Sequence, residues 1–330
     1  RTVRIILMSA TIDVDKFARY YSTPLKGFLI PAPILSISEP PRYDTKIYYL
    51  EQLTIIFKDK IAAMKPEPDP VVTVEMCELV VEVIKRLDMV ETNTGHLPAS
   101  HDQHNSSLVR GAVLVFVPGI LEIENIITKM RGCAQQCRWT IFPLHSSITL
   151  EEQKEAFKSS APGYRKLIVA TNIAESSITV PDVRYVVDLC LTKVLHCDPV
   201  PNFTCLKMAW ASKASCDQRA GRTGRTSNGR VYRIITNRFY QKLSTYSTPE
   251  MVRCPLSLSV LKTKRLNMGQ PAALLALALD PPNIADIART ILTLKQLGCL
   301  TVSRGSRASA LDGDMTHLGN IAAQLPLDPH

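Results

Sequence analysis

A chain of 330 residues is long enough for roughly two domains, and a hydrophobic content of 45% allows each a sizeable core. The net charge of +9 favours a polyanionic partner, although charge alone is a weak indicator. No apolar run reaches about 18 residues, so we expect no membrane span and no membrane partner.

The first elements lie before residue 46. The apolar run at 5–8 predicts a core strand that leads into a loop with the sequence SAT at 9–11. Residues 13–21 are expected to form a short helix, since an aspartate near its start can cap the first turn. Prolines and alternating apolar residues over 23–45 indicate extended chain that crosses to a new domain.

Between residues 46 and 245, strand-like and helix-like apolar patterns alternate. Short buried runs predict strands, helical periodicity predicts helices, and Thr149 with Glu152 forms a capping box. In chain order we expect a helix at 71–87, a strand at 113–117, a helix at 120–131, a strand at 140–144, a helix from 149, and strands at 166–170 and 183–189. This alternation predicts a doubly wound α/β domain on a parallel sheet, with ligand groups on loops at the carboxyl ends of its strands.

The remaining segments indicate a hairpin, a polar loop and a helical C-terminal part. Residues 193–211 are typical of a β-hairpin. The polar stretch 91–110 carries three histidines without the regular spacing of a metal site, and no metal site is expected in the chain. The nine cysteines include no CxxC pair, so buried free thiols in a reducing compartment are expected. Helical patterns then cover 255–266, 271–279, 284–297 and 312–325, with a short strand at 300–302.

The run QRAGRTGR at 218–225 carries the most specific signal in the chain. It places Arg219, Arg222 and Arg225 three residues apart, a spacing that keeps side chains on one helical face. The intervening glycines remove side chains where a backbone or a polyphosphate must come close. A guanidinium is always charged and directs two N–H donors at phosphate oxygens, which favours a role in phosphoryl transfer over an ordinary basic surface helix.

Four blocks, in the same order, resemble the conserved motifs of the DEAH-box helicases of superfamily 2. QRAGRTGR is similar to motif VI of that family, whose pattern is QRxGRxGR, and TNIAESSIT at 171–179 is similar to motif V. VLVFVPG at 113–119 resembles motif IV, and SAT at 9–11 resembles motif III. WASKASCDQRAGRTGR and DMTHLGNIAAQLPL look most like the spindle-E group, germline helicases with tudor domains that work with PIWI-interacting RNAs.

The resemblance implies a domain organisation. Residues 1–45 would be the C-terminal end of a first RecA-like domain with its linker, and residues 46–245 a second RecA-like domain. Residues 246–330 would be a mostly α winged-helix domain with the start of a helical ratchet region. That winged helix is expected to be a structural hub more than a DNA-binding module. The hairpin at 193–211 would either help to separate strands or be an ordinary surface hairpin.

Two nucleotide-binding motifs of the family do not occur in this sequence, which holds neither a G-x-x-x-x-G-K-[ST] loop nor a DExH block. Those motifs cradle phosphates and hold Mg²⁺. We therefore expect a piece of a longer helicase whose cofactor is ATP with Mg²⁺, the magnesium ligands lying in the missing N-terminal domain. The chain alone is not expected to hydrolyse ATP.

The resemblance also implies roles for individual residues. Arg222 and Arg225 would be arginine fingers on the β- and γ-phosphates, and Gln218 would orient the attacking water or the γ-phosphate. Arg219 would make structural or interdomain pairs. Phe157 would either stack on the base or be a core residue. The other expected positions are Thr179, Asp182, Gly221 and Gly224 for ATP, Thr171, Asn172 and Ser146 for RNA, and Ser9 and Thr11 for coupling the two sites.

Three positions depart from the family pattern. Ser176 replaces the usual threonine of motif V and retains the hydroxyl, and Thr223 stands where alanine is common. Asp182 lies one place beyond the aspartate that contacts ribose in the family, which puts only that contact in doubt.

Two functions from different classes are compatible with these residues. In the first, the intact protein is an ATP-dependent RNA helicase or RNP-remodelling ATPase that acts on single-stranded RNA. It would work with PIWI-pathway proteins in the cytoplasm, in perinuclear germ granules. In the second, it is a non-catalytic RNA-binding scaffold that clamps RNA without unwinding it. Intact Gln218, Arg222 and Arg225 favour the first.

Overall fold

The chain divides into two compact units. The computed structural model describes residues 5–9, 11–37, 43–58, 61, 69–94, 110–158, 160–176, 180, 182–198, 203–301 and 312–325. The first unit draws on residues 1–12, 36–193 and 208–247, and the second on 13–35, 194–207 and 248–330. The expected boundaries at 45/46 and 245/246 stay predictions.

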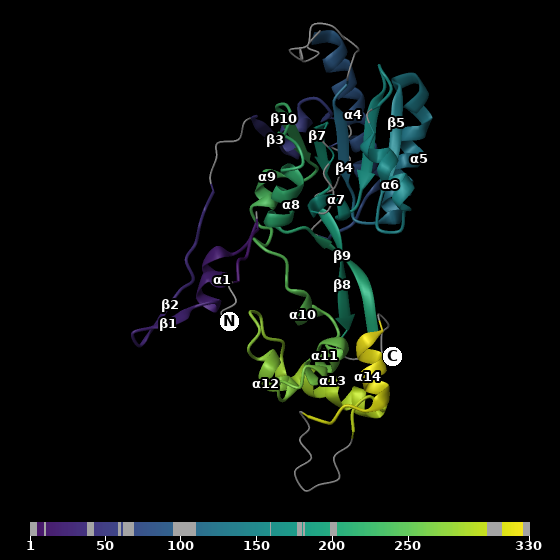
Figure 1. The fold of residues 1–330 in the computed structure, drawn as a ribbon. Helices are drawn as coiled ribbons and strands as arrows, with labels where there is room; N and C mark the ends of the chain where they lie inside the picture. The colour runs from purple at the N-terminus through teal and green to yellow at the C-terminus, as the bar shows by residue number, and fades with distance from the viewer. Residues whose placement is uncertain are drawn as a thin grey trace. The chain divides into compact units, whose positions relative to one another are not determined.

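A six-stranded, fully parallel sheet organises the first unit, in the order β3-β10-β7-β4-β6-β5 (Figure 1). Its strands are β3 (Thr45–Tyr48), β4 (Ala112–Phe116), β5 (Trp139–Leu144), β6 (Arg165–Ala170), β7 (Val183–Asp188) and β10 (Gly229–Arg233). The central strands are buried on both faces, as their continuous apolar runs predict. The predicted doubly wound α/β fold, RecA-like in its sheet and flanking helices, is therefore confirmed.

Helices cover both faces of this sheet. Within its described residues, the first unit contains α2 (Leu50–Thr54), α4 (Val74–Thr94), α5 (Ile120–Cys137), α6 (Leu150–Phe157), α7 (Ile173–Ser176), α8 (Lys213–Ala220) and α9 (Asn237–Tyr240). Residues of α4 and α5 pack with Val113 and Val115 of β4 on one face, while α6, α7 and α8 pack with Leu114 and Phe116 on the other. Alternate residues of one strand therefore serve two separate cores. The capping box predicted at Thr149 is present.

Mostly helical structure makes up the second unit. It contains α1 (Val14–Tyr20), the antiparallel hairpin of β1 (Thr23–Leu25) and β2 (Phe28–Ile30), α10 (Glu250–Arg253), α11 (Ser257–Arg265), α12 (Pro271–Leu275), α13 (Ile284–Gln296) and α14 (His317–Gln324). The core of this unit joins α11, α12, α13 and α14, and an antiparallel bridge pairs Leu300 with Met315. The expected helical remainder is confirmed. The hairpin of β8 (Leu191–Asp198) and β9 (Phe203–Trp210) also forms, and its residues are shared between the two units.

The strand expected at residues 5–8 does not form. Ile5, Ile6, Leu7 and Met8 lie in irregular chain with side chains 51% to 89% exposed. A strand is stabilised by ladder hydrogen bonds to a neighbour, and among the described residues no strand pairs with this run. The helix expected at 13–21 is present as α1, and the Asp13 side chain accepts from the Lys16 N–H at its start. Within the described residues, no helix combines the length and apolar character that a membrane crossing requires.

A buried ionic cluster holds the amino end of β6 to α4. Arg165 is fully buried; its guanidinium is ion-paired with Asp88 and Glu91, and it also donates to the Gly111 carbonyl oxygen at 2.6 Å. Glu91 also accepts from the Tyr185 hydroxyl. Burial first, and then this carboxylate, raise the pKa of Tyr185, so the phenol stays neutral and donating.

We expect Arg165→Met to lower the free energy of unfolding of the first unit by about 3 kcal/mol, because it removes the fully buried cation that Asp88 and Glu91 share. The two carboxylates would then depend on Arg110 and Arg184 for their ion pairs. Trp139 and Trp210 are the two tryptophans of the chain and both belong to this unit. Urea unfolding followed by tryptophan fluorescence therefore reports it directly.

The matched control is Lys158→Met, which removes the partner of Glu155 in a pair whose side chains are 67% and 56% exposed. Its effect should stay within about 0.5 kcal/mol, because water screens exposed pairs. Equal effects of the two substitutions would contradict a structural role for the buried cluster.

Candidate functional site

The loops expected to contact RNA meet at one edge of the sheet. Ser146 follows β5, and Thr171 with Asn172 follows β6. These strands pair in parallel with Leu144 opposite Ala170, and the Thr171 N–H donates to the Leu144 carbonyl oxygen at 3.1 Å. Ser146 and Asn172 are exposed and Thr171 is half-buried. The carboxyl edge therefore presents hydroxyl and amide groups that suit phosphate and sugar contacts without reading base sequence.

Of the three arginines in the run 218–225, Arg219 points into the protein. It is 1% exposed, and it lies in the last turn of α8. Its guanidinium pairs with Asp188 at 2.8 Å and with Glu175 at 3.1 Å, and lies 5.3 Å from the centre of the Phe116 ring. Desolvation lowers the pKa of Arg219, but the two carboxylates outweigh it, so the pKa rises and the charge is fixed.

Arg222 and Arg225 leave the helix, which corrects the expectation that all three arginines share one helical face. Helix α8 ends at Ala220, and the chain continues as a turn in which Gly224 has a φ of +75°. A Cβ at Gly224 would collide with the Thr45 side chain at the start of β3. The helix therefore ends before Arg222, and the left-handed backbone at Gly224 continues the turn, so the last two arginines leave the face that buries Arg219.

This turn lies at the amino edge of the sheet. Thr223 donates to the carbonyl oxygens of Val183 and Arg184, at 3.1 and 2.9 Å, where β7 begins. Asp182 lies beside the same strand start and pairs with buried Lys166 at 2.9 Å. The expectation that ligand loops gather at the carboxyl ends is therefore wrong for Asp182 and for the arginine turn, since β7 presents its other end to them.

Arg222 and Arg225 lie close enough for their positive charges to repel one another. Arg222 is half-buried and Arg225 is exposed; each donates from Nε to a backbone oxygen four residues back, at 3.4 and 3.2 Å. Burial first, and then the neighbouring Arg225, lower the pKa of Arg222, while Glu175 opposes the shift. Two neighbouring guanidiniums favour a nearby anion.

Gln218 connects the arginine turn to the residues expected to couple the two sites. Its side-chain amide donates to the Thr11 hydroxyl, and the Thr11 N–H donates to the Ser9 hydroxyl at 3.3 Å. Residue 10 lies outside the described residues. The structure thus brings Gln218, Thr11 and Ser9 into one hydrogen-bonded chain.

Three other expected positions have different outcomes. Phe157 is half-buried and packs against the core cluster of Leu114 and Phe116, which is a core contact; its stacking role stays a prediction. Thr179 lies outside the described residues. Gly221 follows α8 directly, and its N–H donates to the Asp217 carbonyl oxygen at 2.9 Å.

Sequence reasoning missed the acidic partners of Arg219. Asp188 is the last residue of β7 and is fully buried, while Glu175 lies in α7 and also accepts from the Ser215 hydroxyl. A carboxylate that ends an otherwise apolar strand was the available signal, because such a buried charge requires a cation partner.

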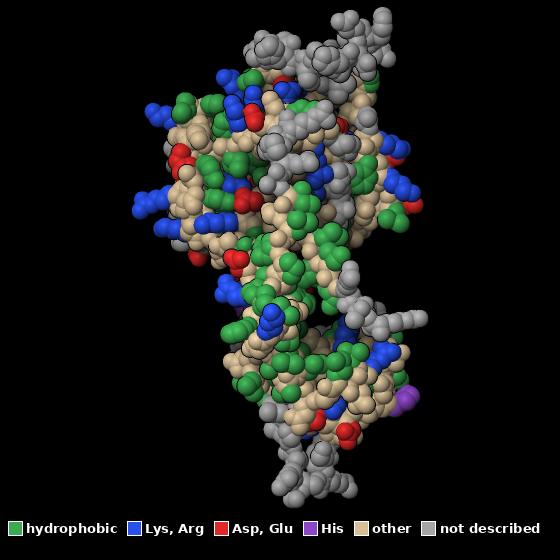
Figure 2. Space-filling model, turned by 60° about the vertical axis from the view of Figure 1, so that its left-hand side comes forward, with side chains coloured by type: hydrophobic (Ala, Val, Ile, Leu, Met, Phe, Trp, Pro, Cys, Tyr) green, Lys and Arg blue, Asp and Glu red, His purple; other side chains and the backbone are tan. Residues whose placement is uncertain are grey.

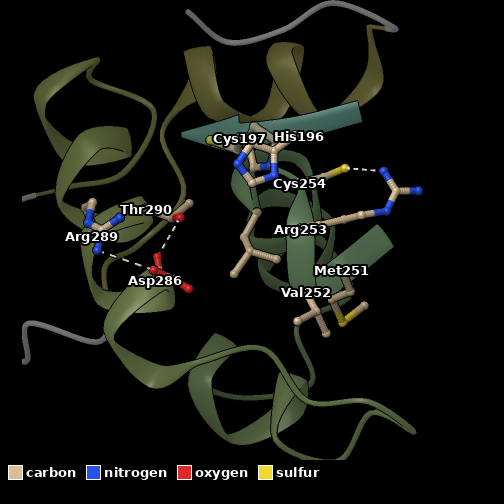
Figure 3. Close-up of a pocket in the computed structure, with 11 residues that line it drawn as sticks. His196, Cys197, Met251, Val252, Arg253, Cys254, Asp286, Arg289 and Thr290 are labelled. Carbon is tan, nitrogen blue, oxygen red and sulfur yellow. Dashed lines mark hydrogen bonds and ion pairs between the residues drawn. The ribbon is translucent and has the colours of Figure 1, made fainter. Parts of the chain in front are cut away.

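The second unit contains a small cavity of about 250 Å³ lined by residues of β8, α10 and α13. Figure 3 shows His196 and Cys197 on one side of it, and Asp286 paired with Arg289 at 3.3 Å on another. None of the expected site residues lines it. On the face of the α/β unit seen in Figure 2, Lys and Arg side chains lie among acidic and hydrophobic ones.

We expect Gly224→Ala to destabilise the first unit by about 1–3 kcal/mol, because the new side chain combines a left-handed backbone with the Thr45 collision. Thermal unfolding followed by tryptophan fluorescence measures it. The control is Gly132→Ala in α5, where an added Cβ meets nothing within 4 Å. That change should stabilise by roughly 0.5–1 kcal/mol. Equal shifts would show that the turn is not constrained.

Comparisons with known proteins identify related sequences and a related fold. Residues 99–227 match the helicase conserved C-terminal domain. The chain is 44% identical over 332 residues to the ATP-dependent RNA helicase TDRD9 of Homo sapiens, covering 99% of this chain and 24% of that protein. It is 43% identical over 334 residues to the probable ATP-dependent RNA helicase spindle-E of Drosophila persimilis, covering 100% and 23%. The chain thus spans about a quarter of the length of these curated relatives.

Among solved structures, the Escherichia coli DEAH/RHA helicase HrpB superposes with a TM-score of 0.66 at 25% identity. The match covers 90% of this chain and 32% of HrpB. The sequence and fold matches together confirm the resemblance carried by motifs III to VI. The chain therefore carries a helicase conserved C-terminal domain, and over nearly its whole length its sequence is similar to the TDRD9 and spindle-E RNA helicases.

Proposed function

We propose that this chain is the RNA-contacting and phosphate-sensing part of an ATP-dependent RNA helicase or RNP-remodelling ATPase. The observation that carries the proposal is the division of the arginine run. Arg219 is paired with two buried carboxylates, whereas Arg222 is half-buried and Arg225 is exposed on the turn that follows α8, close enough for Arg225 to lower the pKa of Arg222. A surface helix that served only solubility would not need this division.

The two edges of the sheet support separate roles. The carboxyl edge, with Ser146, Thr171 and Asn172, would hold single-stranded RNA through its backbone. The amino edge, with Arg222 and Arg225, would receive the triphosphate of ATP. Gln218, through its bond to Thr11, would report the state of that phosphate to the segment before α1.

The residues present fit a triphosphate better than its metal. Two guanidiniums can neutralise charge that develops on a transferred phosphoryl group. Magnesium would accompany ATP on carboxylates supplied from outside this chain, since the sequence holds no DExH block. We thus propose that the other half of the nucleotide site, with the magnesium ligands, lies outside this chain.

The resemblance to the spindle-E group supports a finer proposal. The protein would act in germline silencing by PIWI-interacting RNAs, with PIWI-pathway proteins as partners. It would reside in the cytoplasm, in perinuclear germ granules. Co-purification of short PIWI-bound RNAs with the tagged protein from germ cells would test this assignment, and their absence would remove it.

In the full-length protein, we expect Arg222→Ala to reduce RNA-stimulated ATP hydrolysis by about 10³-fold while RNA binding is retained. An arginine finger acts on the transition state, so the loss should appear mainly in kcat. The matched control is Arg131→Ala on α5, which removes an exposed arginine from outside the site.

The scaffold alternative gives a different result in the same assay. Wild-type protein would then bind RNA without measurable hydrolysis, and Arg222→Ala would change nothing. A fall in hydrolysis caused equally by Arg131→Ala would contradict the role of the arginine turn.

For the 330-residue chain alone, we expect weak binding of single-stranded RNA that falls steeply with salt and no ATP turnover. Asn172→Ala should weaken binding about fivefold, the equivalent of one neutral hydrogen bond of about 1 kcal/mol. Fluorescence anisotropy with a labelled oligouridylate measures both, with Gln135→Ala on the exposed side of α5 as control. ATP turnover by this chain, or an unchanged affinity in Asn172→Ala, would contradict the assignment.

A further inference from the structure

Two sulfurs and a carboxylate converge where β7 ends and α8 begins. Asp188 is the last residue of β7, Cys190 follows two places later, and Cys216 lies in the first half of α8. All three are fully buried, and their ligand atoms lie within 4.8 Å of one another. Sequence spacing gave no sign of this cluster, because the two cysteines are far apart in the chain.

The Asp188 carboxylate is satisfied on one side only. Its Oδ1 accepts from the Cys190 N–H and from the Arg219 guanidinium, each at 2.8 Å. Its Oδ2 is buried and has no hydrogen-bond partner. A buried carboxylate oxygen without a donor is costly, so a cation at Oδ2 would remove an existing penalty.

Cys190 has an unusual backbone. Its φ is +56°, in the left-handed region that is unfavourable for a residue with a Cβ. Strain of this kind persists where the surrounding structure requires it, and here it directs the Cys190 N–H to Asp188. The same cluster contains the apolar side chains of Ala211, Ile235 and Leu243, and the Arg233 guanidinium lies close enough to act on both thiols.

The charged side chains around the cluster carry a net negative charge, which is compatible with a divalent cation. Arg219 and Arg233 are paired with Asp188, Glu175 and Asp217, which makes three carboxylates for two guanidiniums. A divalent cation that displaces one proton from each thiol leaves the net charge of the buried region unchanged. Arg219 and the Cys190 N–H would then be the outer partners that orient a ligating carboxylate.

We propose that Asp188, Cys190 and Cys216 form a structural binding site for a thiophilic divalent cation of the zinc class. Zinc with thiolate and carboxylate ligands places their atoms roughly 3.5–3.8 Å apart, so the groups would move inward by at most about 1 Å. The three side chains fill three of the four positions that zinc prefers. The bound ion would tie the end of β7 to the helix that carries Gln218 and Arg219.

The test is the zinc content of the 330-residue chain, purified with zinc supplied and then passed through a weak chelator. We expect about one zinc per chain by elemental mass spectrometry, falling to background in Cys190→Ser and in Cys216→Ser. Cys77→Ser is the matched control, since Cys77 is a buried cysteine of α4 outside the cluster. Circular dichroism establishes that each variant is folded.

A second measurement does not depend on any variant folding. Cobalt substitution of the wild-type chain should produce the ligand-field and thiolate charge-transfer bands of a tetrahedral site with sulfur ligands. Zinc at background, zinc retained by both variants, cobalt without thiolate bands, or a disulfide between Cys190 and Cys216 would each overturn the proposal.

Discussion

The buried ion pair of Arg219 with Asp188 and Glu175 is the constraint on which the arrangement of the site depends. It joins the end of β7 to α7 and α8, and α8 lies far from the other two elements in sequence. Burying a guanidinium is expensive unless charge and hydrogen bonds replace water, and here two carboxylates, the Leu191 carbonyl oxygen and the Phe116 ring do so. One arginine of the run is thereby fixed inside the protein, and this fixes the orientation of the residues that follow it.

Helix α8 and the turn after it consequently contact both ends of β7. Arg219 is bound at the carboxyl end of β7, while Thr223, four residues later, is bound at the amino end of the same strand. The long Arg219 side chain spans part of this distance, and the turn at Gly221 covers the rest. The arginine turn, where we propose that phosphate binds, is therefore held by the same short segment that is bound at the carboxyl end of β7.

The sequence was sufficient for the parts of the fold that local patterns determine. Continuous apolar runs such as 113–117 predicted central strands, and the Thr149 capping box predicted where α6 begins, because both depend on neighbouring residues. The run at 5–8 has the same composition but forms no strand, since strand formation depends on a pairing partner elsewhere. The spacing of the three arginines predicted one helical face, but the helix ends at Ala220, so only Arg219 lies on it.

The sequence indicated which residues belong to the site, but it did not indicate where these residues lie relative to one another. Motif resemblance named Arg222 and Thr171, yet nothing in the sequence indicated that they lie at opposite ends of parallel strands. That separation arises from the crossing of α8 over β7, which is a tertiary property. The acidic partners of Arg219 were equally hidden, because Asp188 and Glu175 become neighbours only when β7 and α7 pack against α8.

The segment that enters the sheet is attached to the arginine turn. The Asp44 N–H donates to the Asn228 side chain at 3.1 Å, and the Gly229 N–H donates to the Asp44 carbonyl oxygen at 2.8 Å. Thr45 lies where a Cβ on Gly224 would stand. A displacement of the chain before Asp44 must therefore move the turn or break these bonds. Since Arg222 and Arg225 stand on that turn, their position is coupled to the linker as directly as to the helix that precedes them.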